Sequence, residues 1–479
     1  MVREWWRNSP LERRGTVRLV AVSALAGLVA AAGAVGAAGP WEGGQRKAEL
    51  DRAAAGAAHA DGRHAGPRVP TAPPVLAALG GRATAQEPTR DGLAAVLEPL
   101  LKDAALGTDR SAAVYDAATG QQLYGSAPDT AYTPASTIKP ATAAAALAAL
   151  GPDHRIDTTV VAGGDGIVLV GGGDPTLTAH PAKAAGPQQP ASLQDLAEAT
   201  ARKLKERGTD HTKLAYDASL YSGPPLHVIG PNENIAPVSA LMTDEGRLDD
   251  SDHGPAGRSA DPAGDAARKF AELLGERGVK VDGDVTQGAA GAKAERLAAV
   301  SSPPLAALVE RALTNSDNDI AEALARQTAL ASGQPASFEG AAKAVTERLD
   351  KLGLQGARIA DGSGLDRADQ VSAAFLAQLL VRAADPAHPE LRPVLTGLPV
   401  AGFTGTLSGR YADEETGRGT VRAKTGTLTG VNTLAGTAVS ADGRLLTFAF
   451  MSSGTNDADA AQRVLDRMAT TVAGCGCGG

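Results

Sequence analysis

Aromatic side chains are scarce in this chain, since they make up only 3% of its 479 residues. All three tryptophans (Trp5, Trp6 and Trp41) precede residue 42, so the cores must be built mainly from alanine, leucine and valine. The only cysteines are Cys475 and Cys477, which excludes a disulfide framework and leaves a terminal Cys-x-Cys as weak evidence for a metal site. We expect residues 475–479 to form a flexible tail. The net charge of -8 and the lack of a basic stripe argue against nucleic acid as a partner.

Charge is absent from a stretch near the N-terminus. Five arginines and two glutamates lie before residue 19, whereas residues 19–41 contain no charged side chain. Arginines ahead of an uncharged run are typical of an export signal whose N-terminus stays in the cytoplasm. We therefore expect residues 1–40 to be a signal peptide or a membrane anchor, and the exported chain to lie at the extracytoplasmic face of the membrane or in the cell wall. Residues 41–90, rich in Ala, Gly and Pro, are predicted to be a disordered linker.

The apolar pattern after residue 90 predicts two interleaved folded parts. Residues 91–155 and 295–474 combine helical patterns with a strand hairpin near 111–124 and a strand meander within 420–451. A final helix from Asp457 to Ala473 is expected to cover one face of this sheet. Residues 156–294 have short apolar strands punctuated by Gly and Pro, and are predicted to be a β-rich inserted module. Within it, the acidic and Gly-rich stretch from 244 to 264 predicts an exposed loop.

Ser136 and Lys139 lie three residues apart, directly before an alanine-rich run that ends at Gly151. If Ser136 opens the helix predicted for this run, both side chains lie on one face of it. A serine hydroxyl is a weak nucleophile that needs a neighbouring base, and a desolvated lysine can be that base. A Ser-x-x-Lys match is expected roughly once by chance in a chain of this composition, so the pair alone does not identify an active site.

Two further motifs change that assessment. Ser316-Asp317-Asn318 lies between two helical patterns, and Lys424-Thr425-Gly426, followed by Thr427, lies on a predicted strand. The triplet Ser-Asp-Asn also has a purely structural explanation, because these residue types are preferred at helix N-caps. The occurrence of all three motifs once each, in this order and on these elements, is nevertheless very improbable by chance.

With this motif set the sequence resembles the penicillin-binding proteins and serine β-lactamases. The closer resemblance is to the low-molecular-mass, class C type D-alanyl-D-alanine carboxypeptidases, which also act as peptidoglycan endopeptidases. It spans residues 90–473 and includes a long insert and the secondary signatures Gly172–Leu177, Ala236–Leu241, Asp361–Leu365 and Leu398–Leu407. The resemblance implies an α+β, penicillin-binding/β-lactamase-like transpeptidase fold, with an antiparallel sheet covered by helices, a helical subdomain and the inserted module.

The resemblance also implies catalytic roles for individual residues. Ser136 would attack the carbonyl of the D-Ala-D-Ala bond, and Lys139 would accept its proton. Ser316 would pass that proton to the amine of the departing D-alanine, and Lys424 would keep the network of hydrogen bonds ready for this transfer. Asn318 would hold the peptide through its side-chain amide.

The implied substrate-binding residues lie on the third motif. Thr425 and Thr427 would bind the terminal carboxylate beside Gly426, and the backbone amides of Ser136 and Thr427 would form an oxyanion hole. The implied partners are a peptidoglycan peptide ending in D-Ala-D-Ala, β-lactam antibiotics, and the membrane if the N-terminal segment is not cleaved. No metal or cofactor is implied, and no His-Glu-x-x-His pattern occurs. The segment Pro224–Asn234 lacks the Trp or Tyr that family members often carry there, so the preferred stem-peptide residue stays open.

Two other interpretations share these motifs. A class A β-lactamase uses a glutamate in a Glu-x-x-Leu-Asn loop, whereas residues 347–350 read Glu-Arg-Leu-Asp, and the long insert also argues against this class. A noncatalytic protein that binds β-lactams or the cell wall would keep the fold without turnover. The intact set of motif residues argues against such a protein, although the sequence does not determine the rate of deacylation.

Overall fold

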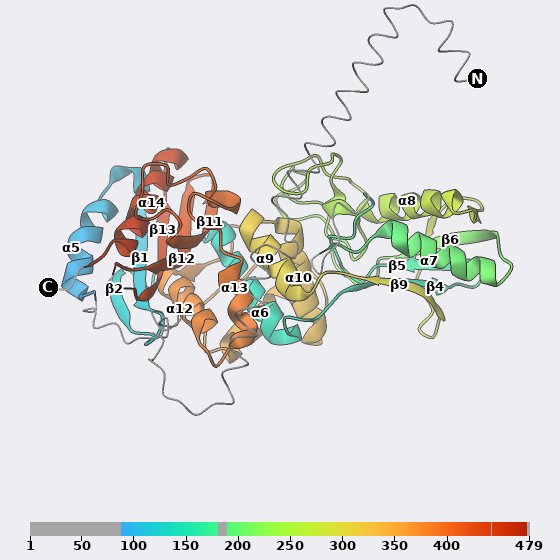
Figure 1. Ribbon diagram of the computed structural model, residues 1–479, viewed down its shortest axis with the longest axis horizontal. Helices are drawn as coiled ribbons and strands as arrows, with labels where there is room; N and C mark the ends of the chain where they lie inside the picture. The colour runs from blue at the N-terminus through green and yellow to red at the C-terminus, as the bar shows by residue number, and fades with distance from the viewer. Residues whose placement is uncertain (1–87, 181–188, 442, 477–479) are drawn as a thin grey trace, which may run out of the picture. The chain divides into compact units, whose positions relative to one another are not determined.

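The computed structural model describes residues 88–180, 189–441 and 443–476 (Figure 1). The predicted signal or anchor segment (1–40), nearly all of the predicted linker (41–90) and the end of the predicted tail (477–479) lie outside the described residues. Cys475, which the sequence assigned to a flexible tail, is only 3% exposed and is disulfide-bonded. No helix within the described ranges is long and apolar enough to cross a membrane.

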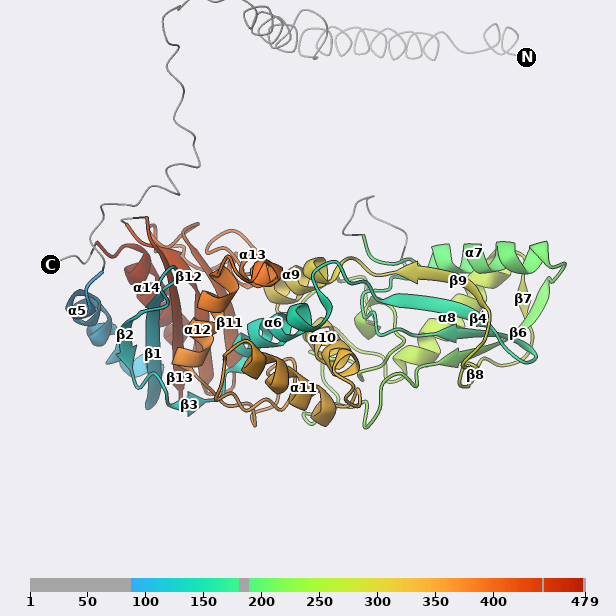
Figure 2. The same ribbon diagram turned by 90° about the horizontal axis from the view of Figure 1, so that it is seen from below.

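One sheet has five antiparallel strands in the order β11-β12-β13-β1-β2 (Figures 1 and 2). The predicted hairpin and the predicted meander supply all of its strands, and β1 pairs with β13 from Asp109 opposite Ser453 to Asp116 opposite Leu446. The antiparallel sheet expected from the sequence is thus confirmed. The strands are β1 (Asp109–Asp116), β2 (Gln122–Ser126), β11 (Val421–Leu428), β12 (Val431–Val439) and β13 (Leu445–Ser453).

The two faces of this sheet enter two separate cores, because successive side chains of a strand point to opposite faces. Ala112 and Val114 of β1 pack in one core with residues of α5 (Arg90–Leu101) and α14 (Ala458–Ala473). Ala113 and Tyr115 pack in the other core with residues of six helices. These are α6 (Lys139–Leu150), α9 (Leu305–Asn315), α10 (Asn318–Ala331), α11 (Phe338–Lys351) and α12 (Ala373–Ala384), followed by the short α13 (Arg392–Thr396).

The start of α6 corrects one prediction. The first α-helical residue is Lys139, and Ser136 lies in a preceding 3₁₀ turn, η2 (Ala135–Ile138). Pro140 explains the boundary, since proline is tolerated only in the first turn of an α-helix. The predicted end is confirmed, because Gly151 follows Leu150 with φ +82°. Ser136 and Lys139 still share a face, since residues three apart also eclipse in a 3₁₀ turn.

A second sheet carries the inserted module, with the strand order β7-β6-β5-β4-β9 and β8 paired with β6. It mixes antiparallel pairs (β4 with β5 and β9) with parallel pairs (β6 with β5, β7 and β8). The sequence analysis predicted that the module ends at residue 294, but β9 pairs with β4 and extends this sheet to Ser301. Its elements are β4 (Asp157–Ala162), β5 (Gly166–Val170), α7 (Leu193–Glu206), β6 (His211–Asp217), α8 (Pro262–Glu276), β7 (Lys280–Val281), β8 (Thr286–Gln287) and β9 (Arg296–Ser301).

Candidate active site

Lys139 is the centre of a small polar cluster. Its side chain is 1% exposed, and its Nζ lies 2.8 Å from Ser136 Oγ, 2.7 Å from Asn318 Oδ1 and 2.6 Å from the carbonyl oxygen of Ser363. These three acceptors come from η2, from the start of α10 and from the segment between α11 and α12. The structure therefore brings together the first two predicted motifs, and adds a backbone carbonyl that the sequence analysis missed.

The surroundings of Lys139 favour an amine that can act as a base. Burial lowers the pKa of Lys139 to about 8, while nearby acidic groups, Asp361 first among them, oppose that shift. In the neutral form a lysine has two N–H donors and one lone pair. Asn318 Oδ1 and the Ser363 carbonyl can take the two donors, which leaves the lone pair to accept the proton of Ser136. The arrangement suits proton abstraction from a serine nucleophile.

Ser316 and Lys424 form a second pair. Lys424 Nζ donates to Ser316 Oγ at 2.8 Å and to the Thr425 carbonyl at 2.8 Å, and the Lys424 side chain is fully buried. Burial, reinforced by the charge of Lys139, holds the pKa of Lys424 well below its usual value. Ser316 itself ends α9 in the left-handed conformation (φ +59°, ψ +38°), which is uncommon for a residue with a side chain. This bend aims the hydroxyl at β11 while α10 begins two residues later.

Asp317 caps the N-terminus of α10, which is the structural role that its residue type alone would explain. Its carboxylate is the N-cap of α10 and accepts from Ile320 N–H at 2.9 Å. The Ser-Asp-Asn triplet therefore both caps α10 and contributes to the site, because the capping Asp317 lies between two residues that contact the buried lysines. Ser316 bonds to Lys424, and Asn318 bonds to Lys139.

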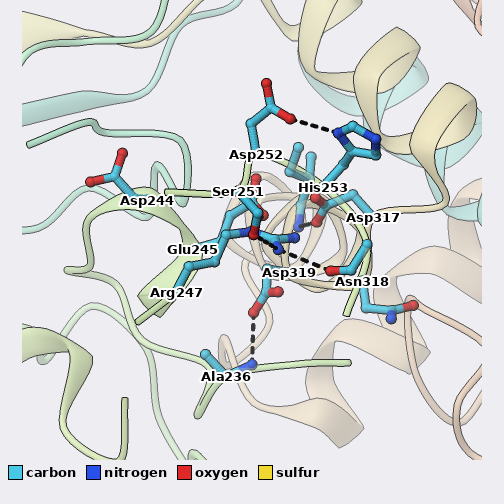
Figure 3. A network of polar contacts seen from close by, with 12 residues as sticks. Ala236, Asp244, Glu245, Arg247, Ser251, Asp252, His253, Asp317, Asn318 and Asp319 are labelled. Carbon is cyan, nitrogen blue, oxygen red and sulfur yellow. Dashed lines mark hydrogen bonds and ion pairs between the residues drawn. The ribbon is translucent and has the colours of Figure 1, made fainter. Parts of the chain in front are cut away.

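The inserted module contacts the same loop (Figure 3). Asn318 Nδ2 donates to the Asn234 carbonyl at 2.9 Å, and Asp319 accepts from Ala236 N–H at 2.9 Å. Glu245 is fully buried and pairs with Arg247 at 3.0 Å and with Arg311. The prediction that the whole stretch from 244 to 264 is an exposed loop is thus wrong at its start, and also at its end, where residues 262–264 form the buried first turn of α8. Composition showed the acidic charge, but not the arginines that neutralise it.

The third motif lies on β11, an edge strand of the five-stranded sheet. Thr425 Oγ1 donates to Thr406 Oγ1 at 2.9 Å, and Thr427 is exposed. Gly426 faces the Ser136 turn, since a Cβ built on it would lie 2.6 Å from the Pro134 carbonyl oxygen. That carbonyl is itself fixed by the hydroxyls of Thr137 and Thr433, each at 2.7 Å. Glycine is therefore required where β11 touches the turn that carries Ser136.

Two clusters of buried side chains have a spacing that would suit a metal ion, with ligand atoms within 4.8 Å of one another. In one of them Asp361 is already hydrogen-bonded to His227, at 2.9 Å. In the other, arginines neutralise Glu245 and Asp319, with Arg258 at 3.0 Å from Asp319. Internal partners thus bind Asp361 in the first cluster and Glu245 and Asp319 in the second, and we assign no metal to either cluster. The clusters are His227, Glu322 and Asp361, and Glu245, Asp317 and Asp319.

Known proteins are similar to this chain in sequence and in fold. The model of the D-Ala-D-Ala carboxypeptidase 3 (S13) family matches residues 93–253 and 249–474. A carboxypeptidase of Mycobacterium tuberculosis is 39% identical over 445 residues, which cover 87% of this chain and 92% of the relative. A D-alanyl-D-alanine carboxypeptidase of Actinomadura sp. is 30% identical over 461 residues, which cover 80% of this chain and 84% of that protein.

A solved structure confirms the predicted fold class. Penicillin binding protein 4 of Haemophilus influenzae has a TM-score of 0.64 and 22% sequence identity to this chain. The match covers 80% of this chain and 98% of that protein.

Replacing Gly426 tests the contact between β11 and the Ser136 turn. Gly426→Ala should lower the free energy of unfolding by about 1–3 kcal/mol, because the added methyl group overpacks a site bounded by the Thr433 hydroxyl and by backbone atoms of Pro134 and Thr137. Denaturation with urea measures this change. Gly409→Ala is the matched control, since a Cβ at Gly409 meets no atom within 4 Å, and it should change stability by less than about 0.5 kcal/mol. Equal effects of the two substitutions would show that the contact at Gly426 is absent.

Proposed function

The chain belongs to the D-Ala-D-Ala carboxypeptidase 3 (S13) family, and we propose that it is a serine-type carboxypeptidase that removes the terminal D-alanine from peptidoglycan stem peptides. The observation that carries the proposal is the position of Lys139, which is buried and in hydrogen-bond contact with Ser136. The names of the carboxypeptidases from Mycobacterium tuberculosis and Actinomadura sp. support the same activity.

The proposed acylation starts with attack by Ser136 Oγ on the carbonyl carbon of the D-Ala-D-Ala peptide bond, while Lys139 takes the hydroxyl proton. The tetrahedral intermediate collapses when its C–N bond breaks. Ser316, which is hydrogen-bonded to Lys424, gives a proton to the departing D-alanine amine and receives in return the proton that Lys139 took from Ser136, so that Lys139 is neutral again before deacylation. The products of this stage are free D-alanine and a peptide esterified to Ser136.

Deacylation reverses the roles. Water attacks the ester carbon, Lys139 takes the water proton, and the proton returns to Ser136 as the ester bond breaks. The peptide leaves with a new terminal carboxylate, so one water molecule is consumed per bond cleaved. The backbone amides of Ser136 and Thr427 are proposed as the oxyanion hole, in which each donor contributes on the order of 3 kcal/mol to transition-state stabilisation.

Substrate binding is proposed along β11. An edge strand has unpaired backbone N–H and C=O groups, to which an extended peptide can add as a further strand. Thr425, Gly426 and Thr427 lie on this edge, and the two threonine hydroxyls suit the terminal carboxylate of the substrate. Asn318 would hold the peptide backbone through its side-chain amide while it also contacts Lys139.

We also propose that β-lactam antibiotics acylate Ser136, as strained analogues of the scissile peptide bond. The Haemophilus influenzae protein with the same fold has been solved in complex with a β-lactam. Because peptidoglycan lies outside the cytoplasmic membrane, the proposal requires export, and the arginines followed by the uncharged run of residues 19–41 support it. The segment 1–40 is proposed to act as a signal peptide or as a membrane anchor.

Release of D-alanine from a pentapeptide ending in D-Ala-D-Ala tests the activity. Ser136→Ala should lower the rate at least about a thousandfold, because it removes the nucleophile. Ser301→Ala, which alters a serine of β9 in the second sheet, should leave the rate unchanged. Liberated D-alanine can be followed with a coupled D-amino acid oxidase assay. Wild-type protein that releases no D-alanine, or a Ser136→Ala variant that retains the activity, would refute the proposal.

The pH dependence of acylation tests the role of Lys139. Only the neutral amine can take the serine proton, and the pKa of Lys139 is lowered to about 8. The second-order rate constant for acylation by a β-lactam should therefore rise with pH, half-maximally near pH 8, and fall about tenfold per pH unit well below it. Stopped-flow measurements from pH 6 to pH 10 give this profile. A midpoint near the ordinary lysine value, or a flat profile, would contradict the assignment of Lys139 as the base.

A further inference from the structure

His227 is a buried histidine that the proposed reaction does not use. It lies in the inserted module, between β6 and α8, and is only 3% exposed. Its Nε2 lies 2.9 Å from Asp361 Oδ2, and its Nδ1 lies 3.3 Å from the backbone nitrogen of Ile229. The ring of Phe338 packs edge-on against it at 5.3 Å between centroids. Because Nδ1 accepts from the Ile229 N–H, the ring proton lies on Nε2, which therefore donates to Asp361.

Asp361 organises the short loop that follows it. Its Oδ1 accepts from Ser363 N–H at 3.0 Å and Gly364 N–H at 2.5 Å, and its Oδ2 accepts from Asp366 N–H at 2.7 Å and Ser363 Oγ at 3.1 Å. The carboxylate is 3% exposed, so its charge must be balanced by these donors and by His227. Burial raises the pKa of Asp361, but the hydrogen bonds from His227, which contribute most to lowering it, and from Asp369 and Gly364 keep this pKa below its usual value.

The same loop determines where the base lies. The carbonyl of Ser363 accepts from Lys139 Nζ at 2.6 Å, and the carbonyl of Gly362 accepts from Thr142 Oγ1 of α6 at 2.8 Å. Gly364 has φ +83°, and a Cβ on it would collide with the carbonyl of Ala135. The loop is thus packed against the Ser136 turn as well as against Lys139. A shift of Ser363 would move one of the three acceptors that hold the amine.

We propose that His227 is a positioning residue for Lys139, acting through Asp361 and the Ser363 carbonyl, so that the inserted module supplies a part of the active site that acylation requires. Three consecutive contacts, at 2.9, 3.0 and 2.6 Å, carry the connection from His227 to Lys139. The inference rests on the proposed function, because it concerns the rate at which Ser136 is acylated.

The raised pKa of His227 agrees with this arrangement. Burial opposes a charge on the ring, but the hydrogen bond to Asp361 and its negative charge outweigh burial, with smaller contributions from Glu322 and Asp366. The Nε2 proton faces Asp361 both in the imidazolium and in the neutral tautomer, so the hydrogen bond to Asp361 does not depend on the charge of the ring. The pair also shares its surroundings with the buried Glu322, whose side chain accepts from Gly362 N–H at 3.0 Å.

The test compares two substitutions of His227. His227→Gln keeps a side-chain N–H donor and an acceptor, as in the neutral imidazole, whereas His227→Ala removes both. Acylation by a chromogenic cephalosporin is followed by stopped flow at pH 8, which separates the acylation rate constant from the dissociation constant of the preceding complex. We expect His227→Ala to lower the rate constant by about 10- to 100-fold with little change in the dissociation constant, because the base is displaced rather than the substrate site. His227→Gln should stay within about threefold of wild type, since it preserves the hydrogen bond.

His211→Ala is the matched control, because His211 is an exposed histidine of β6 that pairs at 3.3 Å with the exposed Asp282. It should match wild type in every parameter. Some molecules of the His227→Ala preparation can be unfolded, so the stoichiometry of the adduct is measured by mass spectrometry and the rate constant is taken from the acylated fraction. His227→Asn, whose shorter side chain places its donor away from Asp361, should behave like His227→Ala and supplies a second polar variant.

A wild-type rate constant in His227→Ala, with only the stoichiometry or the stability reduced, would overturn the inference and leave His227 as a packing residue. Equal impairment of His227→Gln and His227→Ala would also overturn it, because the donor would then not matter. A wild-type protein that is not acylated at all would instead refute the proposed function, which distinguishes the two failures.

Discussion

The burial of one amine is the constraint on which this structure depends. A buried lysine is costly unless its donors are satisfied, and Lys139 meets that condition only where three separate segments converge. Ser136, Asn318 and Ser363 each lie on a different segment, so the helices and the sheet must be in place before the amine has its partners. Burial lowers the pKa of Lys139 and buried acids raise it, and the balance leaves an amine that ionises near pH 8. Moderate basicity is what a base for a serine hydroxyl needs.

The inserted module is part of this site. The strands of its sheet do not pair with those of the five-stranded sheet, but its loops contact the residues around the site. Asn234 and Ala236 bond to Asn318 and Asp319 at the start of α10. Glu245 pairs with Arg311 of α9, and His227 bonds to Asp361. The contacts of Ala236, Glu245 and His227 are buried or partly buried, and those of Glu245 and His227 involve charged groups that are costly to separate from their partners. The module and the motif-bearing helices therefore stabilise each other, which gives a physical reason for the length of chain between the first two motifs.

Much of the fold and of the candidate site could be predicted, because the relevant signals are local. The strand patterns and turn residues predicted the hairpin and the meander whose strands form the five-stranded sheet, and the alanine run with Gly151 predicted α6; the pairing of β1 with β13, which joins them, was not predicted. The exact start of α6 was missed, because Pro140 shifts the α-helix to Lys139 and leaves Ser136 in a 3₁₀ turn. The left-handed Ser316 and the Ser363 carbonyl could not be predicted, since backbone geometry and carbonyl position have no side-chain signature. The burial of Glu245 was missed for a different reason, because its partner Arg311 is distant in the sequence and meets it only in the folded chain.

The central claim is that Ser136 is an acylating nucleophile with Lys139 as its base. The most direct measurement is the intact mass of the full chain after incubation with benzylpenicillin, beside the same measurement on Ser136→Ala. We predict one covalent adduct per wild-type molecule, located on the peptide that contains Ser136, and none on the variant. An adduct that persists identifies a penicillin-binding protein, whereas rapid loss of the adduct with consumption of the antibiotic indicates a β-lactamase. No adduct and no consumption of benzylpenicillin would contradict the account.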